Sequence, residues 1–268
     1  MNEQQVALAF SRQARIFDAC YESDSIIRYK RQRVRERLLQ GVAPGSHILE
    51  LNAGTGIDAV WLAEQGYRVH ATDVAPGMQS ALREKVVSMG LQAMISHEIC
   101  SYTALEGLQN KGPFDVVFSN FAGLNCTGDL EKVLQSLSSL VRPGGQVTLV
   151  ILPGFCLWES LLVFKGMFRT AFRRWGVGRE GADSRVEGTH FRCWYYSPSY
   201  VARVMKPDFQ LLGWEGLCTI VPPSYIEGFA EKYPRFYDRL CRLENRWKGI
   251  WPWRSIGDYY VISFRRRG

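Results

Sequence analysis

The stretch ILELNAGTG, residues Ile48–Gly56, decides the fold expected for this 268-residue chain. It begins as a short apolar run of the kind buried on both faces of a sheet, and it ends in a glycine-rich turn. Gly54 and Gly56 let the backbone turn sharply, and the helix expected after them points its free N–H groups into the same space. Asp73 ends the next expected strand, where its carboxylate can accept hydrogen bonds from a ribose diol. Together these residues predict a nucleoside-binding site.

Expected strands and helices alternate on both sides of this turn. After the first strand, His47–Leu51, the strand-like segments are Tyr67–Ala71, Phe114–Ser119, Gln146–Leu152 and Ile256–Arg265. The helical patterns between them are Met78–Met89 and Leu130–Val141. This alternation predicts an α/β fold with an open, mostly parallel sheet covered by helices on both faces. Ligands in such sheets bind beyond the carboxyl ends of the strands.

The nucleoside could belong to either of two cofactors, because Gly54-x-Gly56-x-x-Ala59 also fits the dinucleotide fingerprint. Three features favour another kind of site. Glu50 lies within the first strand, where the dinucleotide motif normally has an apolar residue. FDVVFSN places a polar end on a later strand, and RPGGQVTLVIL supplies a Pro-Gly-Gly turn into a fifth strand.

In the order, spacing and type of these motifs, residues 15–152 resemble the class I S-adenosylmethionine-dependent methyltransferase family. The resemblance implies a Rossmann-like, seven-stranded, mostly parallel sheet with helices on both faces, an N-terminal helical lid and a helical insertion after the fifth strand. It also implies S-adenosyl-L-methionine as the cofactor. The residues that match the family's cofactor-binding positions are Glu50, Asn52, Ala53, Gly54, Gly56, Asp73, Val74, Ser101, Tyr102 and Asn120.

Two of these positions depart from the family pattern. Asn52 replaces the usual first glycine, although Asn adopts left-handed conformations more readily than most residues. Ser101 stands where an Asp is common, so its contact with the adenine is in question.

We expect one domain, since 268 residues can bury a single sizeable core. Its parts are the helical lid (1–42), the cofactor-binding core (43–152), an inserted cap (153–195) and a segment that completes the sheet (196–268). Within the cap, an apolar stripe and a basic face over Leu157–Trp175 predict one amphipathic helix. A charged loop is expected over Gly176–Gly188, and a strand over His190–Tyr196.

The acceptor pocket is harder to derive from the sequence. Tyr21 and Tyr29 in the lid, Phe121 after the fourth strand and Tyr196 beyond the cap are its candidates, although ordinary packing would also explain aromatic residues there. Methyl transfer mainly requires alignment of a nucleophile, and a general base only if the acceptor must lose a proton. His190 is the candidate for that role, with a polar strand residue as the alternative.

Composition excludes several classes of protein. The longest apolar stretch, Val147–Phe164, is interrupted by Pro153, Gly154 and Glu159, so we expect no transmembrane segment. The N-terminus lacks a secretory pattern, and seven cysteines without C-x-x-C indicate reduced, cytoplasmic thiols rather than disulfides or a metal site. The chain carries a net charge of +7, with nine Lys or Arg against three Asp or Glu between Lys165 and Lys206. That excess suits an acidic carrier, an anionic membrane surface or simply water.

The sequence therefore predicts methyl transfer to oxygen, nitrogen or carbon of a small-molecule or carrier-bound metabolite. Nucleic acid is disfavoured, because Ser119–Gly123 lacks the Asn-Pro-Pro-Tyr type of signature found in base-methylating relatives. An NAD(P)-dependent oxidoreductase is one alternative, which nicotinamide binding would reveal. A catalytically inactive binding subunit with the same fold is another, which would bind cofactor without turnover. A homo-oligomer and peripheral membrane contact both stay open.

Overall fold

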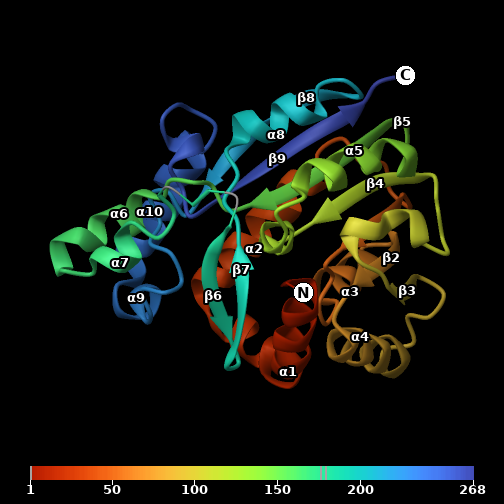
Figure 1. Ribbon diagram of the computed structural model, residues 1–268, viewed down its shortest axis with the longest axis horizontal. Helices are drawn as coiled ribbons and strands as arrows, with labels where there is room; N and C mark the ends of the chain where they lie inside the picture. Colours follow the sequence, from red (N-terminus) through yellow and green to blue (C-terminus); the bar gives the residue numbers. More distant parts are fainter. Residues whose placement is uncertain (1, 176, 179) are drawn as a thin grey trace.

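Seven strands form one sheet in the computed structural model, which describes residues 2–175, 177–178 and 180–268 (Figure 1). Their order across the sheet is β3-β2-β1-β4-β5-β9-β8. The strands are β1 (His47–Leu51), β2 (Arg68–Asp73), β3 (Ile95–Ile99), β4 (Phe114–Ser119), β5 (Val141–Ile151), β8 (Phe209–Leu217) and β9 (Tyr259–Arg266). The first five are parallel, whereas β9 is antiparallel to both β5 and β8. The expected Rossmann-like, mostly parallel sheet is confirmed.

The strand order reverses between β1 and β4. From β1 the chain proceeds to β2 and β3 on one side, and it then returns to β4 and β5 on the other. Open α/β sheets bind ligands at such a switch point, beyond the carboxyl ends of the strands. Leu51 and Ser119 are in register at the ends of β1 and β4, so the two segments that follow these strands begin side by side.

Helices cover both faces of this sheet, as expected. They are α2 (Ser25–Leu38), α3 (Ile57–Glu64), α4 (Pro76–Ser88), α5 (Leu130–Leu140) and α8 (Pro198–Met205). Ile48 and Val116 pack toward α2, α3 and α4, whereas the next residues along each strand, Leu49 and Val117, pack toward α5 and α8. All four are buried, as the two-residue period of a strand covered on both faces requires.

The N-terminal segment forms two helices, α1 (Asn2–Ser23) and α2, with a break between them. Asp24 causes the break, because its side chain caps the new helix by accepting the N–H groups of Ile26 at 2.7 Å and Ile27 at 2.8 Å. Beyond this break, α1 packs against α4 and against β7 (Thr189–Cys193). It therefore lies across the carboxyl ends of the strands, as a lid would.

The insertion after β5 is helical, but the prediction of one helix over Leu157–Trp175 was wrong. Three short elements stand there, α6 (Leu157–Leu161), η3 (Leu162–Lys165) and α7 (Phe168–Ala171). Gly166 ends η3 in the left-handed region, at φ 72°. A left-handed glycine terminates a helix even where the apolar period continues through it.

The charged loop expected over Gly176–Gly188 contains a strand, β6 (Ala182–Val186), which pairs with β7 in a two-stranded sheet. Positions 176 and 179 of that expected loop lie outside the described residues. Glu187 and Gly188 connect β6 to β7 with φ angles of 45° and 76°. Two successive positive φ angles are typical of a tight hairpin turn. A Glu-Gly pair predicts such a turn less strongly than Asn-Gly does, so the hairpin was not expected from the sequence.

The remaining elements lie around this framework. They are η1 (Tyr102–Gly107), η2 (Gly123–Cys126), α9 (Phe229–Lys232), α10 (Pro234–Trp247) and η4 (Trp253–Ser255). Figure 1 shows α6, α7, α9 and α10 gathered at one end of the molecule, opposite the edge formed by β2 and β3. Within the part of the chain that the structure describes, no helix combines the length and apolarity needed to cross a bilayer.

Candidate functional site

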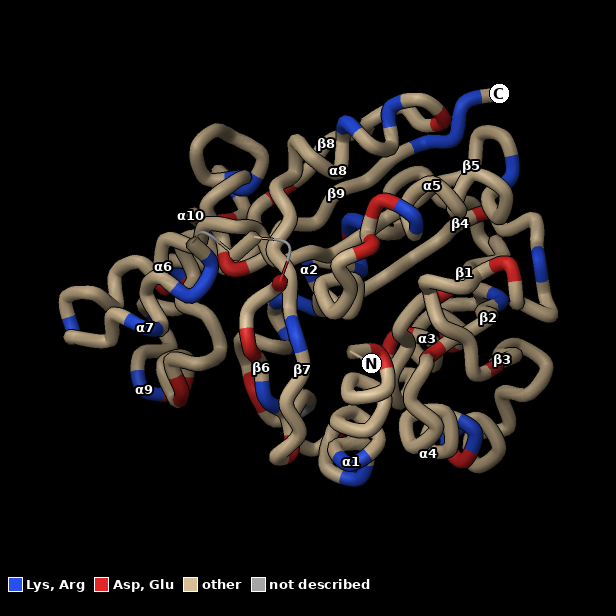
Figure 2. The backbone as a smooth tube through the Cα atoms, viewed as in Figure 1, with Lys and Arg blue, Asp and Glu red and all other residues tan. Residues whose placement is uncertain are grey.

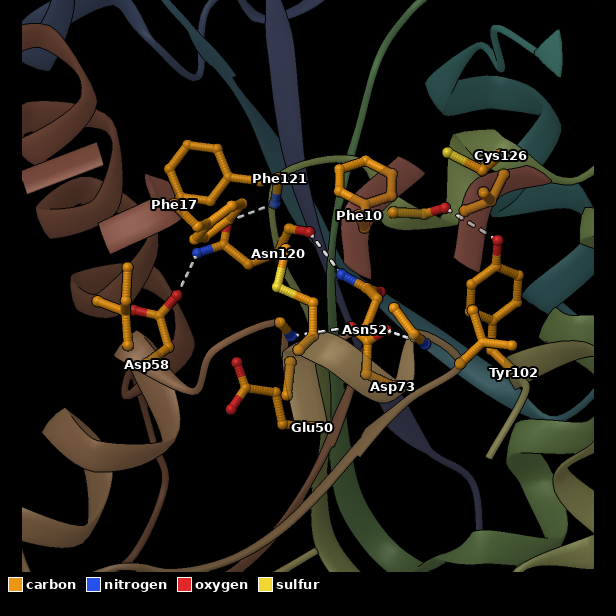
Figure 3. A pocket seen from close by; sticks show the side chains of 18 of the residues that line it. Phe10, Phe17, Glu50, Asn52, Asp58, Asp73, Tyr102, Asn120, Phe121 and Cys126 are labelled. Carbon is orange, nitrogen blue, oxygen red and sulfur yellow. Dashed lines mark hydrogen bonds between the residues drawn. The ribbon is translucent and has the colours of Figure 1, made fainter. Parts of the chain in front are cut away.

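A cavity opens at the switch point, beyond the carboxyl ends of β1, β2 and β4 (Figure 3). Eight of the ten residues predicted to bind the cofactor line it: Glu50, Asn52, Ala53, Gly54, Asp73, Val74, Tyr102 and Asn120. The two others, Gly56 and Ser101, do not. Parallel strands bring these residues together because each follows or ends a strand at the same edge of the sheet.

The turn after β1 accommodates Asn52 in the left-handed region, at φ 47°. Its side chain joins the ends of two strands, because Nδ2 donates to the carbonyl of Asn120 at 2.9 Å and Oδ1 accepts from Ser119 Oγ at 2.6 Å. Gly56 does not face the cavity. It has φ 78° where α3 begins, and a Cβ there would stand 2.2 Å from Leu82 Cδ1. The turn thus needs glycine at position 56 for packing and tolerates asparagine at position 52.

Asp73 holds the ends of β1 and β2 together. Its Oδ2 accepts the N–H of Gly54 at 2.9 Å, and its Oδ1 accepts the N–H of Ala75 at 2.8 Å. Burial raises the pKa of Asp73, while these backbone donors act to lower it. Each carboxylate oxygen keeps a second lone pair, so the group can still accept hydrogen bonds from a ligand.

Glu50 presents a buried carboxylate without a full set of partners. It is 2% exposed, and its Oε2 has no hydrogen-bond partner among the described residues. Burial and the nearby Asp58 raise its pKa well above the ordinary 4.5. Because an unsatisfied buried acceptor costs free energy, its persistence beside a cavity points to a ligand that supplies a donor or a positive charge.

A third carboxylate, Asp58 in the first turn of α3, anchors the opposite wall. It pairs with Arg31, and it accepts from Arg35 Nε at 2.8 Å and from Asn120 Nδ2 at 2.7 Å. Arg31 lines the cavity, with its guanidinium carbon 4.6 Å from the centre of the Phe121 ring. Among the described residues that line the cavity, Arg31 is the one cation and Glu50, Asp58 and Asp73 are the carboxylates.

Aromatic residues of α1 close the cavity from above. Phe10, Phe17 and Tyr21 line it, and Phe17 stacks on Tyr21 with 4.1 Å between ring centres. Tyr21 also meets the edge of Phe121, another predicted pocket residue. Tyr29 lies elsewhere, on α2, where its hydroxyl donates to Glu244 at 3.3 Å.

A second cavity lies beside the first, and the two share Tyr102 and Cys126. Its walls include Trp194, Tyr195, Tyr196 and Tyr200 from the segment that follows β7, together with three residues of the cap, Gly154, Val177 and Gly178. Tyr196, predicted as a pocket residue, donates to the carbonyl of Thr127 at 2.5 Å. A cavity with an aromatic wall, which also contains the carboxylates of Glu3 and Asp129, therefore adjoins the first cavity.

Ser101 and His190, like Gly56 and Tyr29, lie outside both cavities. Ser101 caps η1 through the N–H of Thr103 and donates to Glu3 at 2.8 Å. His190 is on β7 with 60% of its side chain exposed, and its Nδ1 lies 3.0 Å from Asp183. The hairpin turns His190 toward water, so neither the cofactor role of Ser101 nor the acid–base role of His190 gains support from its position.

Sequence reasoning missed several lining residues. Arg31 looked like part of a basic helix face, and only its spacing of four residues from Arg35 could have indicated a shared carboxylate partner. Phe10 lies seven residues before Phe17 and so shares one face of α1 with it, which was a usable signal for Phe10.

A separate buried group, Cys156, Glu159 and Asp258, has atoms close enough to hold a metal ion. Arg174 already occupies that space, because its Nη2 donates to Glu159 at 2.6 Å and to Asp258 at 2.7 Å. Burial and these arginine partners explain the cluster as an internal ion pair network.

Comparison with known proteins assigns the family. A family model for a methyltransferase domain matches residues 48–145. The demethylmenaquinone methyltransferase of Corynebacterium urealyticum is 32% identical over 196 residues, which cover 70% of this chain and 76% of that protein. This chain belongs to the class I S-adenosylmethionine-dependent methyltransferase family. The cofactor of this methyltransferase is accordingly S-adenosylmethionine.

Other relatives of the methyltransferase agree with this result. The malonyl-[acyl-carrier protein] O-methyltransferase of Serratia marcescens is 32% identical over 161 residues, and the match spans 59% of this chain but only 57% of that protein. A S-adenosylmethionine-dependent methyltransferase structure from Listeria monocytogenes, described as putative, superposes with a TM-score of 0.61 at 12% identity, covering 90% of this chain and 97% of the other. At that identity the superposition shows the fold alone.

The isosteric change Glu50→Gln should stabilise the methyltransferase without cofactor. A carboxyl with a raised pKa keeps its proton when folded and loses it on unfolding, so its contribution to stability falls as the pH rises above 4.5. Urea unfolding should therefore show a gain of about 1 to 3 kcal/mol at pH 8, and a smaller gain at pH 5. The control Glu64→Gln, on the exposed end of α3, should change little. A Glu50→Gln protein less stable than the wild type at pH 8 would contradict the reasoning.

Proposed function

We propose that this methyltransferase acts on a small or carrier-bound acceptor with an apolar body, which binds in the second cavity and reacts through oxygen, nitrogen or carbon. The observation that supports this most directly is the aromatic wall of that cavity, formed by Trp194, Tyr195, Tyr196 and Tyr200. The rings of Tyr196 and Tyr200 are stacked, with 5.6 Å between their centres. Aromatic walls favour flat or apolar ligands and disfavour strongly hydrated ones. Because the two cavities share Tyr102 and Cys126, an acceptor bound in the second would lie next to the cofactor.

The first cavity fits the cofactor of the family. Asp73 has free lone pairs for a ribose diol, Glu50 has an unpartnered oxygen for the amino group, and Arg31 can pair with the carboxylate. When bound, S-adenosylmethionine supplies a methyl group that its sulfonium makes electrophilic. The residues around it hold and orient the reactants, and the aromatic lid excludes water.

The charge of the first cavity also separates the two cofactors that the glycine motif allowed. Asp58 is paired with Arg31 and Arg35, so Glu50 and Asp73 are the carboxyl groups among the described lining residues that a ligand can reach. A positive group bound beside Glu50 would lower its raised pKa again, so this site favours a ligand that carries an ammonium or sulfonium group. A dinucleotide would bring a pyrophosphate close to Glu50 and Asp73 instead. The buried carboxyl of Glu50 therefore disfavours the oxidoreductase alternative.

Glu3 and Asp129 are the general-base candidates among the described residues of the second cavity. No histidine or lysine lines either cavity within the described part of the chain. Burial raises the pKa values of Cys126, Tyr102 and Tyr196, and raises that of Tyr195 to about 12, so these groups keep their protons near neutral pH. The proposed acceptor therefore arrives already nucleophilic, as a carboxylate, a free amine or an ionised phenol, or it gives its proton to Glu3 or Asp129. A carrier-bound malonyl group and the reduced, quinol form of demethylmenaquinone are suitable models, after the names of the two relatives.

Arg31 should recognise the carboxylate of the cofactor. Changing Arg31→Met should weaken S-adenosylhomocysteine about 10- to 100-fold, the usual loss for a hydrogen bond to a charged group. The decarboxylated analogue of the same compound should bind the wild type and the variant equally. Calorimetric titration of both compounds gives the comparison directly.

Arg35→Met is the matched control, because Arg35 also pairs with Asp58 but does not line the first cavity. It should weaken both compounds by the same factor, if at all. Equal losses for both compounds in Arg31→Met would instead mean that Arg31 acts only by supporting the fold.

The acceptor proposal is tested with methyl-labelled S-adenosylmethionine and three acceptors: a naphthoquinol, an acyl-carrier-bound carboxylic acid and sarcosine as a small polar amine. Label should enter one of the first two. Tyr200→Ala should then lower kcat/KM for that acceptor about tenfold or more, with the KM for the cofactor unchanged, because Tyr200 lines only the second cavity.

Tyr233→Ala serves as the control, since Tyr233 is exposed and lines neither cavity. Turnover of sarcosine alone would contradict an apolar acceptor. Tight cofactor binding with no turnover of any of the three would favour an inactive binding subunit.

A further inference from the structure

Exposed apolar side chains gather in two segments of the described chain. Segments 155–175 and 225–251 each carry seven large apolar residues that are exposed. Phe164, at 85%, and Trp251, at 74%, have the highest exposures of any exposed large apolar residue in the described ranges. Single exposed apolar residues are ordinary, but a gathering of this size on a water-soluble surface marks an interaction site.

The two segments attach to the same stretch of the chain. Trp158 of α6 donates its Nε1 to the carbonyl of Thr219 at 3.1 Å. The buried carboxylate of Glu244, on α10, accepts the N–H groups of Cys218, Thr219 and Val221, each at 2.9 Å. Both segments are thus held on residues 218–221, and Figure 1 shows α6, α7, α9 and α10 at one end of the molecule. We call segments 155–175 and 225–251 the aromatic end.

α10 shows how the aromatic end is organised. Phe236, Leu243 and Trp247 are separated by seven and four residues, so they form one exposed stripe along the helix. Glu244 and its neighbours bury a second side of α10 against the protein. The side beyond the stripe carries a row of exposed arginines at positions 235, 239, 242 and 246. A helix with an exposed apolar stripe beside a row of arginines has the pattern of helices that lie in a membrane interface.

The charge of the aromatic end is positive. Exposed Lys and Arg number three in 155–175 and five in 225–251, against three exposed Asp and Glu in the two segments together. Figure 2 shows basic positions on α7 and α9. Positive charge alone would suit any acidic partner, but basic residues that border bulky aromatic side chains suit a surface of anionic headgroups above an apolar layer.

We propose that the aromatic end docks on the surface of a bilayer that contains anionic phospholipid. Phe164 and Phe236 enter the boundary between headgroups and acyl chains, and the arginine row of α10 meets the phosphates. Gly154, Val177 and Gly178 connect this end to the second cavity, because the cap that carries Phe164 also forms one wall of that cavity. The further idea that the bilayer supplies an apolar acceptor rests on the proposed function. The docking itself does not depend on it.

Vesicle co-sedimentation tests the docking with the full chain, and without cofactor or acceptor. The protein should bind phosphatidylglycerol-containing vesicles at least about tenfold more tightly than pure phosphatidylcholine vesicles, because each basic residue near an anionic surface adds attraction. Phe164→Ser and Phe236→Ser should each weaken binding by about tenfold, since each withdraws a buried aromatic ring from the interface. Arg239→Glu with Arg242→Glu should abolish the preference for phosphatidylglycerol.

Matched controls are Ile99→Ser, which removes a 59% exposed apolar residue at the far edge of the sheet, and Arg83→Glu on exposed α4. Both should bind vesicles like the wild type. Three results would overturn the proposal. The first is no binding to either kind of vesicle, and the second is an equal loss of vesicle binding in the control variants. The third is a protein that does not bind vesicles but forms a dimer in sedimentation velocity, which Phe164→Ser dissociates. Arginine-dependent capture of acyl carrier protein without vesicle binding would likewise assign the surface to an acidic protein.

Discussion

The buried carboxylate of Asp58 holds the cofactor cavity together. At 3% exposure it joins Arg31 and Arg35 of α2 to the end of β4 through Asn120. Removing one member of such a buried pair leaves an uncompensated charge and costs about 3 to 5 kcal/mol. The position of Arg31 over Phe121, and with it the one cationic point among the described lining residues, follows from this carboxylate.

Two neighbouring cavities, one for the cofactor and one proposed for the acceptor, lie next to Asp58 and its partners. The first combines an apolar and aromatic lining with Arg31, Asp73 and the unpartnered oxygen of Glu50, which suits a sulfonium-bearing cofactor. The second has an aromatic wall with hydroxyl and thiol groups whose raised pKa values keep them protonated, and it also contains the carboxylates of Glu3 and Asp129. Cofactor binding and acceptor choice therefore rest on different residues, and only Tyr102 and Cys126 belong to both. Such a division lets the acceptor wall vary while the cofactor cradle stays the same.

The sequence predicted the parts of this structure that depend on local chemistry. Buried strands, left-handed glycines and the carboxylate of Asp73 each leave a short-range pattern, and the sheet and most of the cofactor cradle followed from them. Features that depend on tertiary contacts did not. The sequence does not distinguish Arg31 from its basic neighbours, because its partner Asp58 lies beside it only in the folded chain. Tyr29 likewise forms a hydrogen bond with Glu244, which is 215 residues away in the sequence. The helix over Leu157–Trp175 failed for a local reason, because its apolar period hid the break at Gly166.

Calorimetric titration of the purified chain with S-adenosylmethionine, S-adenosylhomocysteine and NADH tests the central claim most directly, with Asp73→Ala measured alongside. We predict that the first two compounds bind with micromolar affinity, that Asp73→Ala weakens this binding, and that NADH gives no heat of binding. Tight binding of NADH with no response to the other two would contradict the account of the cavity.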